Sequence, residues 1–205
     1  EIKFYTLIFL KTEKSNVENL VAISKHIGMN LDLVQGSGGN ISVKEDKVLW
    51  VKASGCSLKD AGNNDIFVPV DYLKIITQLT KCEYDSVAPE NLNFRDGTTL
   101  RPSIETSLHA LMPHRYVIHV HSVSAIANVV LDDGKKIVTR LLNGVEWAWV
   151  PYVRPGLPLT RAVQKVMRSG LNVLVLGNHG LVLGADSMDE VFELLDELEN
   201  RLYRL

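Results

Sequence analysis

The sequence predicts an α/β protein with α+β character: a single domain built on a central mixed β-sheet, with helices on both faces. Two observations support this class. Segments with helical spacing alternate along the chain with short runs rich in valine, isoleucine and leucine. The 205 residues are 46% hydrophobic and show no internal repeat, which suits one core of ordinary size. We expect residues 15–205 to form this domain and residues 1–14 to form an N-terminal extension.

The first half of the chain predicts helices around a group of short strands. Residues 15–29 have helical spacing, with Ser15 or Asn16 as a cap and Gly28 as a stop. The following elements are a glycine loop that enters a strand (35–43), a strand that pairs with it as a hairpin (47–52), a small-residue turn (53–57), a strand (66–70) and a helix (71–80). Residues 82–98 are polar and rich in turn formers.

The second half alternates more regularly. Ser103 precedes a helix that Pro113 ends, because a hydroxyl caps a helix start and a proline disfavours helix in the residue before it. The remaining elements are a strand (116–121), a helix (122–130), an extended segment (148–152), a helix (159–168) before Gly170, two strands (171–177 and 178–185) and an amphipathic helix (188–204).

Charge and cysteine content narrow the class of protein. The formal net charge of −2 provides no basic excess for binding nucleic acid. The two cysteines, Cys56 and Cys82, do not make a disulfide framework and fit free thiols in a reducing compartment. The apolar opening of the chain is too short to span a bilayer and has no small-residue cleavage site. We therefore expect a cytoplasmic protein without nucleic-acid or membrane partners.

Two histidines stand two residues apart in V-I-H-V-H-S (117–122), within a run that otherwise predicts a buried strand. Side chains alternate along a strand, so His119 and His121 project from the same face. His179, in the turn G-N-H-G after another apolar run, joins them if the two strands are neighbours. Three imidazoles with one position left open suit a catalytic zinc, and manganese, iron or cobalt are alternatives. The other interpretation is a set of core histidines that are hydrogen-bonded to the backbone.

Glu105 lies in the first turn of the helix that begins after Ser103, where the helix dipole favours a carboxylate. Because this helix immediately precedes the strand of the two histidines, Glu105 is a candidate general acid/base beside a metal. A surface glutamate that stabilises the dipole is the alternative. His109 follows Glu105 by four residues on the same helix face, either as a partner that orients Glu105 or a metal ligand, or as a core residue.

Six segments together resemble a known family. They are G-S-G-G-N-I-S, A-S-G, P-S-I-E-T-S-L-H, H-V-H-S, V-P-Y-x-x-P-G and N-H-G-L. They occur in the same order in the class II aldolase/adducin superfamily, and the resemblance covers residues 17–200. It implies a homotetramer with active sites at subunit interfaces. It also implies a zinc ion on three histidines that match His119, His121 and His179, and an acid/base glutamate that matches Glu105.

The resemblance also implies a phosphate site. Its residues match Ser37, Gly39, Asn40, Ser54, Gly55 and Ser103. Backbone N–H groups and hydroxyls in glycine turns make such an anion cradle, although ordinary turn chemistry explains the same pattern. Ile104 stands where fuculose-type aldolases often carry a second serine, which puts the phosphate in question. The chain also stops soon after His179, so we expect it to lack the C-terminal tyrosine of those aldolases or to be a piece of a longer protein.

The resulting hypothesis is a zinc-dependent aldolase. Its substrate is a ketose phosphate or a related sugar-derived hydroxy-carbonyl compound, which is cleaved through a metal-stabilised enediolate with Glu105 as acid/base. An epimerase, dehydratase or decarboxylase on the same scaffold uses the same chemistry. A non-catalytic adducin-like binding module is the alternative from another class, and it has no reason to retain three histidines and the glutamate.

Overall fold

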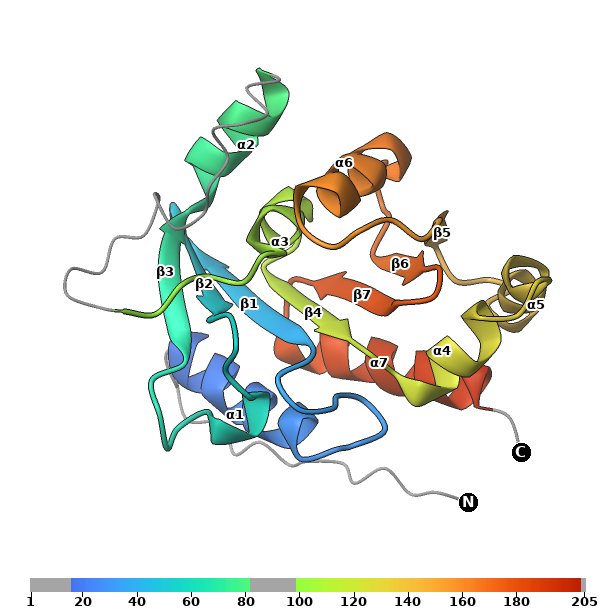
Figure 1. Ribbon diagram of the computed structural model, residues 1–205, viewed down its shortest axis with the longest axis horizontal. Helices are drawn as coiled ribbons and strands as arrows, with labels where there is room; N and C mark the ends of the chain where they lie inside the picture. The colour runs from blue at the N-terminus through green and yellow to red at the C-terminus, as the bar shows by residue number, and fades with distance from the viewer. Residues whose placement is uncertain (1–15, 82–98, 204–205) are drawn as a thin grey trace.

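The computed structural model describes residues 16–81 and 99–203 of the chain, and these residues form one central sheet covered by helices (Figure 1). The strands are β1 (Asn40–Glu45), β2 (Val48–Lys52), β3 (Phe67–Asp71), β4 (Tyr116–Val120), β5 (Trp147–Val150), β6 (Val173–Leu176) and β7 (Gly180–Ala185). Within the described residues they make a seven-stranded sheet in the order β3-β2-β1-β4-β7-β6-β5. The sheet is mixed, because β5 and β6 are parallel and the other neighbours are antiparallel.

The helices are α1 (Asn16–Gly28), α2 (Tyr72–Thr80), α3 (Thr106–Leu111), α4 (Val123–Val129), α5 (Gly134–Leu141), α6 (Leu157–Val166), α7 (Met188–Leu202) and the short 3-10 helix η1 (Leu58–Asp60). One face of the sheet is buried beneath α1, α4, α5 and α7, and the other beneath α2, α3 and α6 (Figure 1). The predicted fold class, a mixed sheet with helices on both faces, is confirmed. No helix among the described residues is long and apolar enough to cross a membrane.

Strand β4 lies at the centre of the sheet, and its pairing determines where the site forms. His119 is paired across the antiparallel ladders with Asn40 of β1 and with Val182 of β7. Alternation then divides β4 between the two layers: Ile118 and Val120 enter the core under α7, while Val117 enters the core under α3 and α6. His119 shares the face of Val117 and therefore points toward α3.

Side-chain caps fix where several helices begin. The Ser187 hydroxyl accepts from the Glu190 backbone N–H, and the Glu190 carboxylate accepts from the Ser187 N–H, which makes a capping box at the start of α7. The Asp71 carboxylate accepts from the Lys74 N–H at 3.0 Å at the start of α2. Ser122, which directly follows His121, caps α4 in the same way, because its hydroxyl accepts from the Ala125 backbone N–H.

Three local features differ from the sequence-based expectation or add to it. Helix α3 begins at Thr106, so Glu105 occupies its N-cap position and not its first turn. Helix α1 ends at Gly28 as predicted, but this glycine is also required by packing, because a Cβ there would lie 2.2 Å from the backbone nitrogen of Lys59. Helix α5 lies in a segment for which the sequence predicted no element. The predicted cap Ser15 and the extension 1–14 lie outside the described residues, and so does the turn-rich segment 82–98.

Candidate active site

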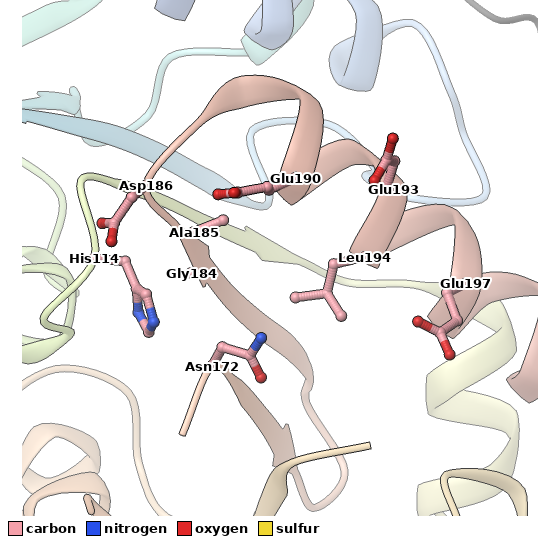
Figure 2. Close-up of a pocket in the computed structure, with 9 residues that line it drawn as sticks. All are labelled: His114, Asn172, Gly184, Ala185, Asp186, Glu190, Glu193, Leu194 and Glu197. Atoms are coloured by element: carbon pink, nitrogen blue, oxygen red, sulfur yellow. The ribbon is translucent and has the colours of Figure 1, made fainter. Parts of the chain in front are cut away.

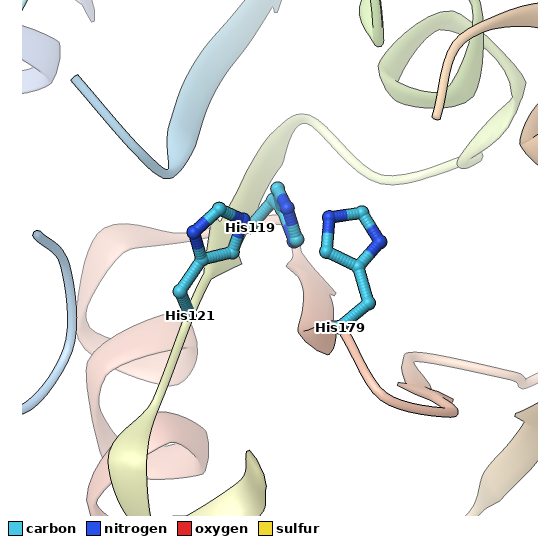
Figure 3. Close-up of side chains that lie close together, drawn as sticks. All are labelled: His119, His121 and His179. Carbon is cyan, nitrogen blue, oxygen red and sulfur yellow. The ribbon is translucent and has the colours of Figure 1, made fainter. Parts of the chain in front are cut away.

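The three predicted histidines lie together at the end of β4. His119 is on the strand, His121 directly follows it, and His179 is in the turn between β6 and β7 (Figure 3). Their ring centroids are 4.9 to 5.2 Å apart. One nitrogen from each ring lies within 4.8 Å of the corresponding nitrogen of the other two. Residues about sixty positions apart in the sequence therefore present three nitrogen atoms to one point.

Glycine in the N-H-G turn makes this convergence possible. Gly180 has a φ of 151°, and a Cβ there would lie 2.2 Å from the backbone oxygen of Val120. A side chain at this position would force the turn away from β4, and His179 would move with it. The close approach that this glycine permits is therefore between two backbones, that of the turn and that of β4.

A hydrogen bond to the backbone determines which ring nitrogen of His119 is available to bind a metal. Its Nδ1 lies 2.8 Å from the backbone oxygen of Leu181, and a carbonyl oxygen only accepts, so Nδ1 carries the proton and donates it. Nε2 then carries a lone pair, and it has no hydrogen-bond partner among the described residues. Burial lowers the pKa of His119, His121 and His179 to about 4, so all three rings are neutral near pH 7.

This donor set fits a divalent cation. Three neutral imidazoles are the ligands that zinc and related metals accept, with a further position left for a substrate. Tetrahedral bonds of about 2.1 Å place ligand nitrogens about 3.4 Å apart, so the rings need only a modest contraction from the observed arrangement. A backbone carbonyl that holds the second nitrogen of a ligating ring, as Leu181 holds His119, is the usual support for such a ligand.

Glu105 stands beside the three rings. Its Oε2 lies 3.5 Å from His119 Nε2, and its Oε1 lies 3.6 Å from His179 Nε2. The Asn40 amide donates to Oε2 at 2.9 Å and thereby orients the carboxylate. Glu105 is 6% exposed, and within the described part of the chain its Oε1 has no hydrogen-bond donor. One carboxylate oxygen, Oε2, is therefore hydrogen-bonded to Asn40, and the other, Oε1, accepts no hydrogen bond from the described residues.

A cavity of about 220 Å³ opens next to this group. Its wall includes Glu105, His121 and His179, together with all six residues that the family resemblance matched to a phosphate site, namely Ser37, Gly39, Asn40, Ser54, Gly55 and Ser103. Two backbone hydrogen bonds bring the loops together, from Ser54 N to Arg101 O at 2.8 Å and from Ser103 N to Lys52 O at 3.2 Å. Two of the three predicted metal ligands, the predicted acid/base and the predicted anion loops thus line one cavity, and their roles stay predictions.

Comparison with known proteins decides the family. Residues 18–203 match the family described as class II aldolase and adducin N-terminal domain. The chain belongs to this family.

Individual relatives agree with the family assignment. The N-terminal class II aldolase domain of a conserved protein from Thermoplasma acidophilum superposes with a TM-score of 0.81 at 25% identity, over 95% of this chain and 96% of that one. L-fuculose phosphate aldolase of Methanococcus maripaludis is 26% identical over 83% of this chain and 87% of its own length.

A third relative is a much longer protein. The uncharacterized oxidoreductase YuxG of Bacillus subtilis is 29% identical over 86% of this chain. The match spans only 27% of the length of that protein. Its name therefore describes a protein most of which lies outside the matched segment.

His109 is a buried residue of α3, which is one of the two alternatives that the sequence left open. It is fully buried, and its Nδ1 lies 2.8 Å from the Ser42 hydroxyl. The described residues show no side-chain hydrogen bond between His109 and Glu105, and the residue that orients Glu105 is Asn40. Burial lowers the pKa of His109 well below its usual value, so the ring is neutral and packs between α3 and β1.

Lys52 also lines the cavity beside Glu105, and the sequence analysis did not single it out. It ends β2, is 2% exposed, and donates from Nζ to the backbone oxygens of Ser37 and Cys56, both at 2.7 Å. The only sequence signal is a lysine at the end of L-W-V-K, two residues before Ser54. A lysine at a strand end is usually solvated, so this pattern alone does not predict a buried cation.

A larger cavity of about 370 Å³ lies between β7 and α7, and its wall includes His114 but none of His119, His121 and His179 (Figure 2). Its wall carries several carboxylates, three of which already have local roles: Glu197 is paired with Arg201, and the other two are Asp186 and Glu190. Asp186 accepts from the Arg115 backbone N–H at 3.0 Å, and Glu190 belongs to the capping box of α7. We therefore place the chemistry in the smaller cavity, where the neutral histidines and the oriented carboxylate meet.

Proposed function

We propose that this protein is a zinc-dependent aldolase-type lyase that cleaves a carbon–carbon bond in a ketose phosphate or a related sugar-derived hydroxy-carbonyl compound. The observation that carries the proposal is the convergence of Glu105 with the nitrogens of His119 and His179, at 3.5 and 3.6 Å. His119, His121 and His179 would hold the cation. When bound, it would supply Lewis-acid stabilisation of the negative charge that develops on substrate oxygen during cleavage.

Glu105 is suited to move the proton in this reaction. When the carbon–carbon bond breaks, the bonding electron pair stays on the fragment that carries the carbonyl and the neighbouring hydroxyl. The carbon of that fragment that was part of the broken bond then takes up a proton. Asn40 fixes one oxygen of the Glu105 carboxylate, which leaves Oε1 to hold and deliver that proton. The other fragment becomes an aldehyde when its hydroxyl loses a proton to solvent or to a base outside this group of residues.

Family membership supports the same substrate class. The relative from Methanococcus maripaludis is an L-fuculose phosphate aldolase, and we extend to this chain a small sugar phosphate as substrate. We also propose the homotetrameric assembly that the family resemblance implied. Ser37, Ser54 and Ser103 line the same cavity as Glu105 and offer it hydroxyl groups, which suits a substrate that carries a phosphate.

The test is the substitution Glu105→Gln, which keeps the shape of the side chain and removes its basicity. We expect the variant to retain a full equivalent of zinc and to lose turnover of a panel of ketose phosphates by roughly 10²- to 10⁴-fold, the usual scale of acid/base catalysis. Glu199→Gln is the matched control, because Glu199 is equally buried, at 6% exposed, but lies on α7 on the opposite face of the sheet.

Two results would overturn the proposal. Normal turnover by Glu105→Gln would remove the assigned role of this residue. Zinc-loaded wild-type protein that yields no aldehyde from any member of the panel would exclude the aldolase activity itself.

A further inference from the structure

One face of strand β1 carries three polar side chains that are buried in the fold. Asn40, Ser42 and Lys44 alternate along the strand with Ile41 and Val43, which enter the core on the other face of the sheet. Each of the three polar residues is at most 9% exposed. Buried polar groups are costly unless they are hydrogen-bonded, so this face of β1 requires a specific set of partners.

Helix α3 supplies these partners. Three hydrogen bonds join the polar face of β1 to the helix, one at each end and one between them: Asn40 to Glu105 at 2.9 Å, Ser42 to His109 at 2.8 Å, and Lys44 to the backbone oxygen of Met112. Met112 is the C-cap residue of α3, so the contacts span the whole helix. We call this set of six residues the polar seam.

The spacing of the polar seam follows from the geometry of a strand beside a helix. Alternate residues of a strand are about 6.6–6.8 Å apart, and residues four apart on a helix are separated by about 6 Å along its axis. The first two polar residues of β1 therefore match Glu105 and His109, which share one face of the helix. Because all three contacts are in register, α3 cannot slide along β1 without losing them together.

Helix α3 depends on such contacts for its position. It contains six residues, and a helix this short is marginal by itself, so its packing determines how it lies. Glu105 is its N-cap residue, and the carboxylate stands 3.5 Å from His119 Nε2 and 3.6 Å from His179 Nε2. Because Glu105 moves with the helix, contacts further along α3 also set these two distances.

Ser42 and Lys44 act on the site only through the helix, because neither lines the cavity beside Glu105. Within the described part of the chain, Nε2 of His109 has no hydrogen-bond partner, which leaves Ser42 as the polar anchor of that ring. Burial lowers the pKa of Lys44 to about 8, so its ammonium group is still mostly charged near pH 7. A cation is favoured at the C-terminus of a helix, and Lys44 also donates to the backbone oxygen of His114 at 2.9 Å, just beyond α3.

We propose that Ser42 and Lys44 are positioning residues of this site: through the polar seam they hold α3 against β1 and thereby keep the Glu105 carboxylate on Asn40 and beside the histidines. The effect on catalysis rests on the proposed function, whereas the coupling of both residues to the bond between Asn40 and Glu105 does not.

The first test follows that bond directly. Exchange of the Asn40 side-chain amide protons with solvent is measured by NMR on the full ¹⁵N-labelled chain, and Asn40→Ala identifies the signal. We expect exchange to be roughly 10-fold faster in Ser42→Ala and in Lys44→Met, because each variant loses a buried hydrogen bond that opposes local opening of α3 from β1.

Ser107→Ala is the matched control. Ser107 is also on α3, is 2% exposed, and shares a hydrogen bond of the same length, 2.8 Å, with the hydroxyl of Thr160 on α6. Its loss removes a buried serine hydroxyl from the same helix but leaves the contacts with β1 in place. Exchange of the Asn40 amide should therefore stay within about 2-fold of wild type.

The second test separates positioning from stability. Turnover of the panel of ketose phosphates is measured per folded, zinc-loaded protein. Ser42→Ala and Lys44→Met should lower kcat about 10-fold and leave KM within about 2-fold, because a displaced Glu105 affects the proton transfer and neither residue lines the cavity. Ser107→Ala should change neither constant.

The inference is overturned if exchange of the Asn40 amide in Ser42→Ala and Lys44→Met matches wild type, or if Ser107→Ala accelerates it as much. Faster exchange with an unchanged kcat, or a rise in KM alone, would overturn the positioning role. Wild type that turns over no member of the panel would remove the proposed function, and exchange of the Asn40 amide would still decide whether the polar seam holds Glu105.

Discussion

Gly38 offers a sharp test of the histidine site, because its missing side chain makes room for His121. A Cβ at this position would lie 2.8 Å from His121 Nδ1 and 2.9 Å from the backbone oxygen of Gln35. Even a tight carbon contact needs about 3.4 Å, so in Gly38→Ala the ring must move by about 0.6 Å or more. Metal–nitrogen bonds tolerate only about 0.2 Å, and the ring therefore cannot both clear the methyl group and remain a ligand.

We expect Gly38→Ala to weaken zinc binding by at least ~10- to 100-fold while the protein stays folded. Competition against a chromogenic chelator measures the affinity, and circular dichroism checks the fold. Gly36→Ala is the control in the same loop. Gly36 has a φ of +58°, so alanine strains the backbone there, but a Cβ would have no atom outside its chain neighbours within 4 Å. Wild-type zinc affinity in Gly38→Ala, or an equal loss in Gly36→Ala, would refute the placement of His121 against this loop.

Three further predictions address positioning, capping and pH. Asn40→Ala should keep zinc but lower turnover about 10- to 100-fold, since Glu105 loses its orienting donor; unchanged kcat would contradict this. Ser187→Ala should lower the unfolding free energy by about 1 kcal/mol in urea titrations, because the capping box with Glu190 is lost. The pKa of Lys44 is about 8 in the fold against 10.5 in the unfolded chain, so the unfolded chain binds more protons between these values. Wild type should therefore gain up to ~3 kcal/mol over Lys44→Met as pH rises from 8 to 10, and a constant difference would contradict the burial.

Local sequence patterns were enough to predict that His119, His121 and Glu105 lie close together. Alternation along a strand is enough to put His119 and His121 on one face, and this face proved to be the one that meets α3. Glu105 was placed near them because its helix is joined to that strand by only a few residues. The meeting with His179 depends on β4 and β7 being neighbours in the sheet, which spacing does not state and which the family resemblance implied.

The features that escaped prediction depend on contacts between distant segments. The partner of Glu105 is Asn40, 65 residues away in sequence, whereas helical spacing pointed to His109. Lys52 is buried only because two loops close over it, and no local pattern separates it from a solvated lysine at a strand end. Helix α5 was missed because its apolar stripe is narrow and its other residues are polar or charged.

X-ray absorption at the zinc edge, on the full chain loaded with one equivalent of zinc, tests the central claim most directly. We predict three imidazole nitrogens at about 2.0–2.1 Å, and the loss of one of them in each of His119→Ala, His121→Ala and His179→Ala. A wild-type spectrum with fewer than three imidazoles, or one that any of these substitutions leaves unchanged, would contradict a metal site built from these residues.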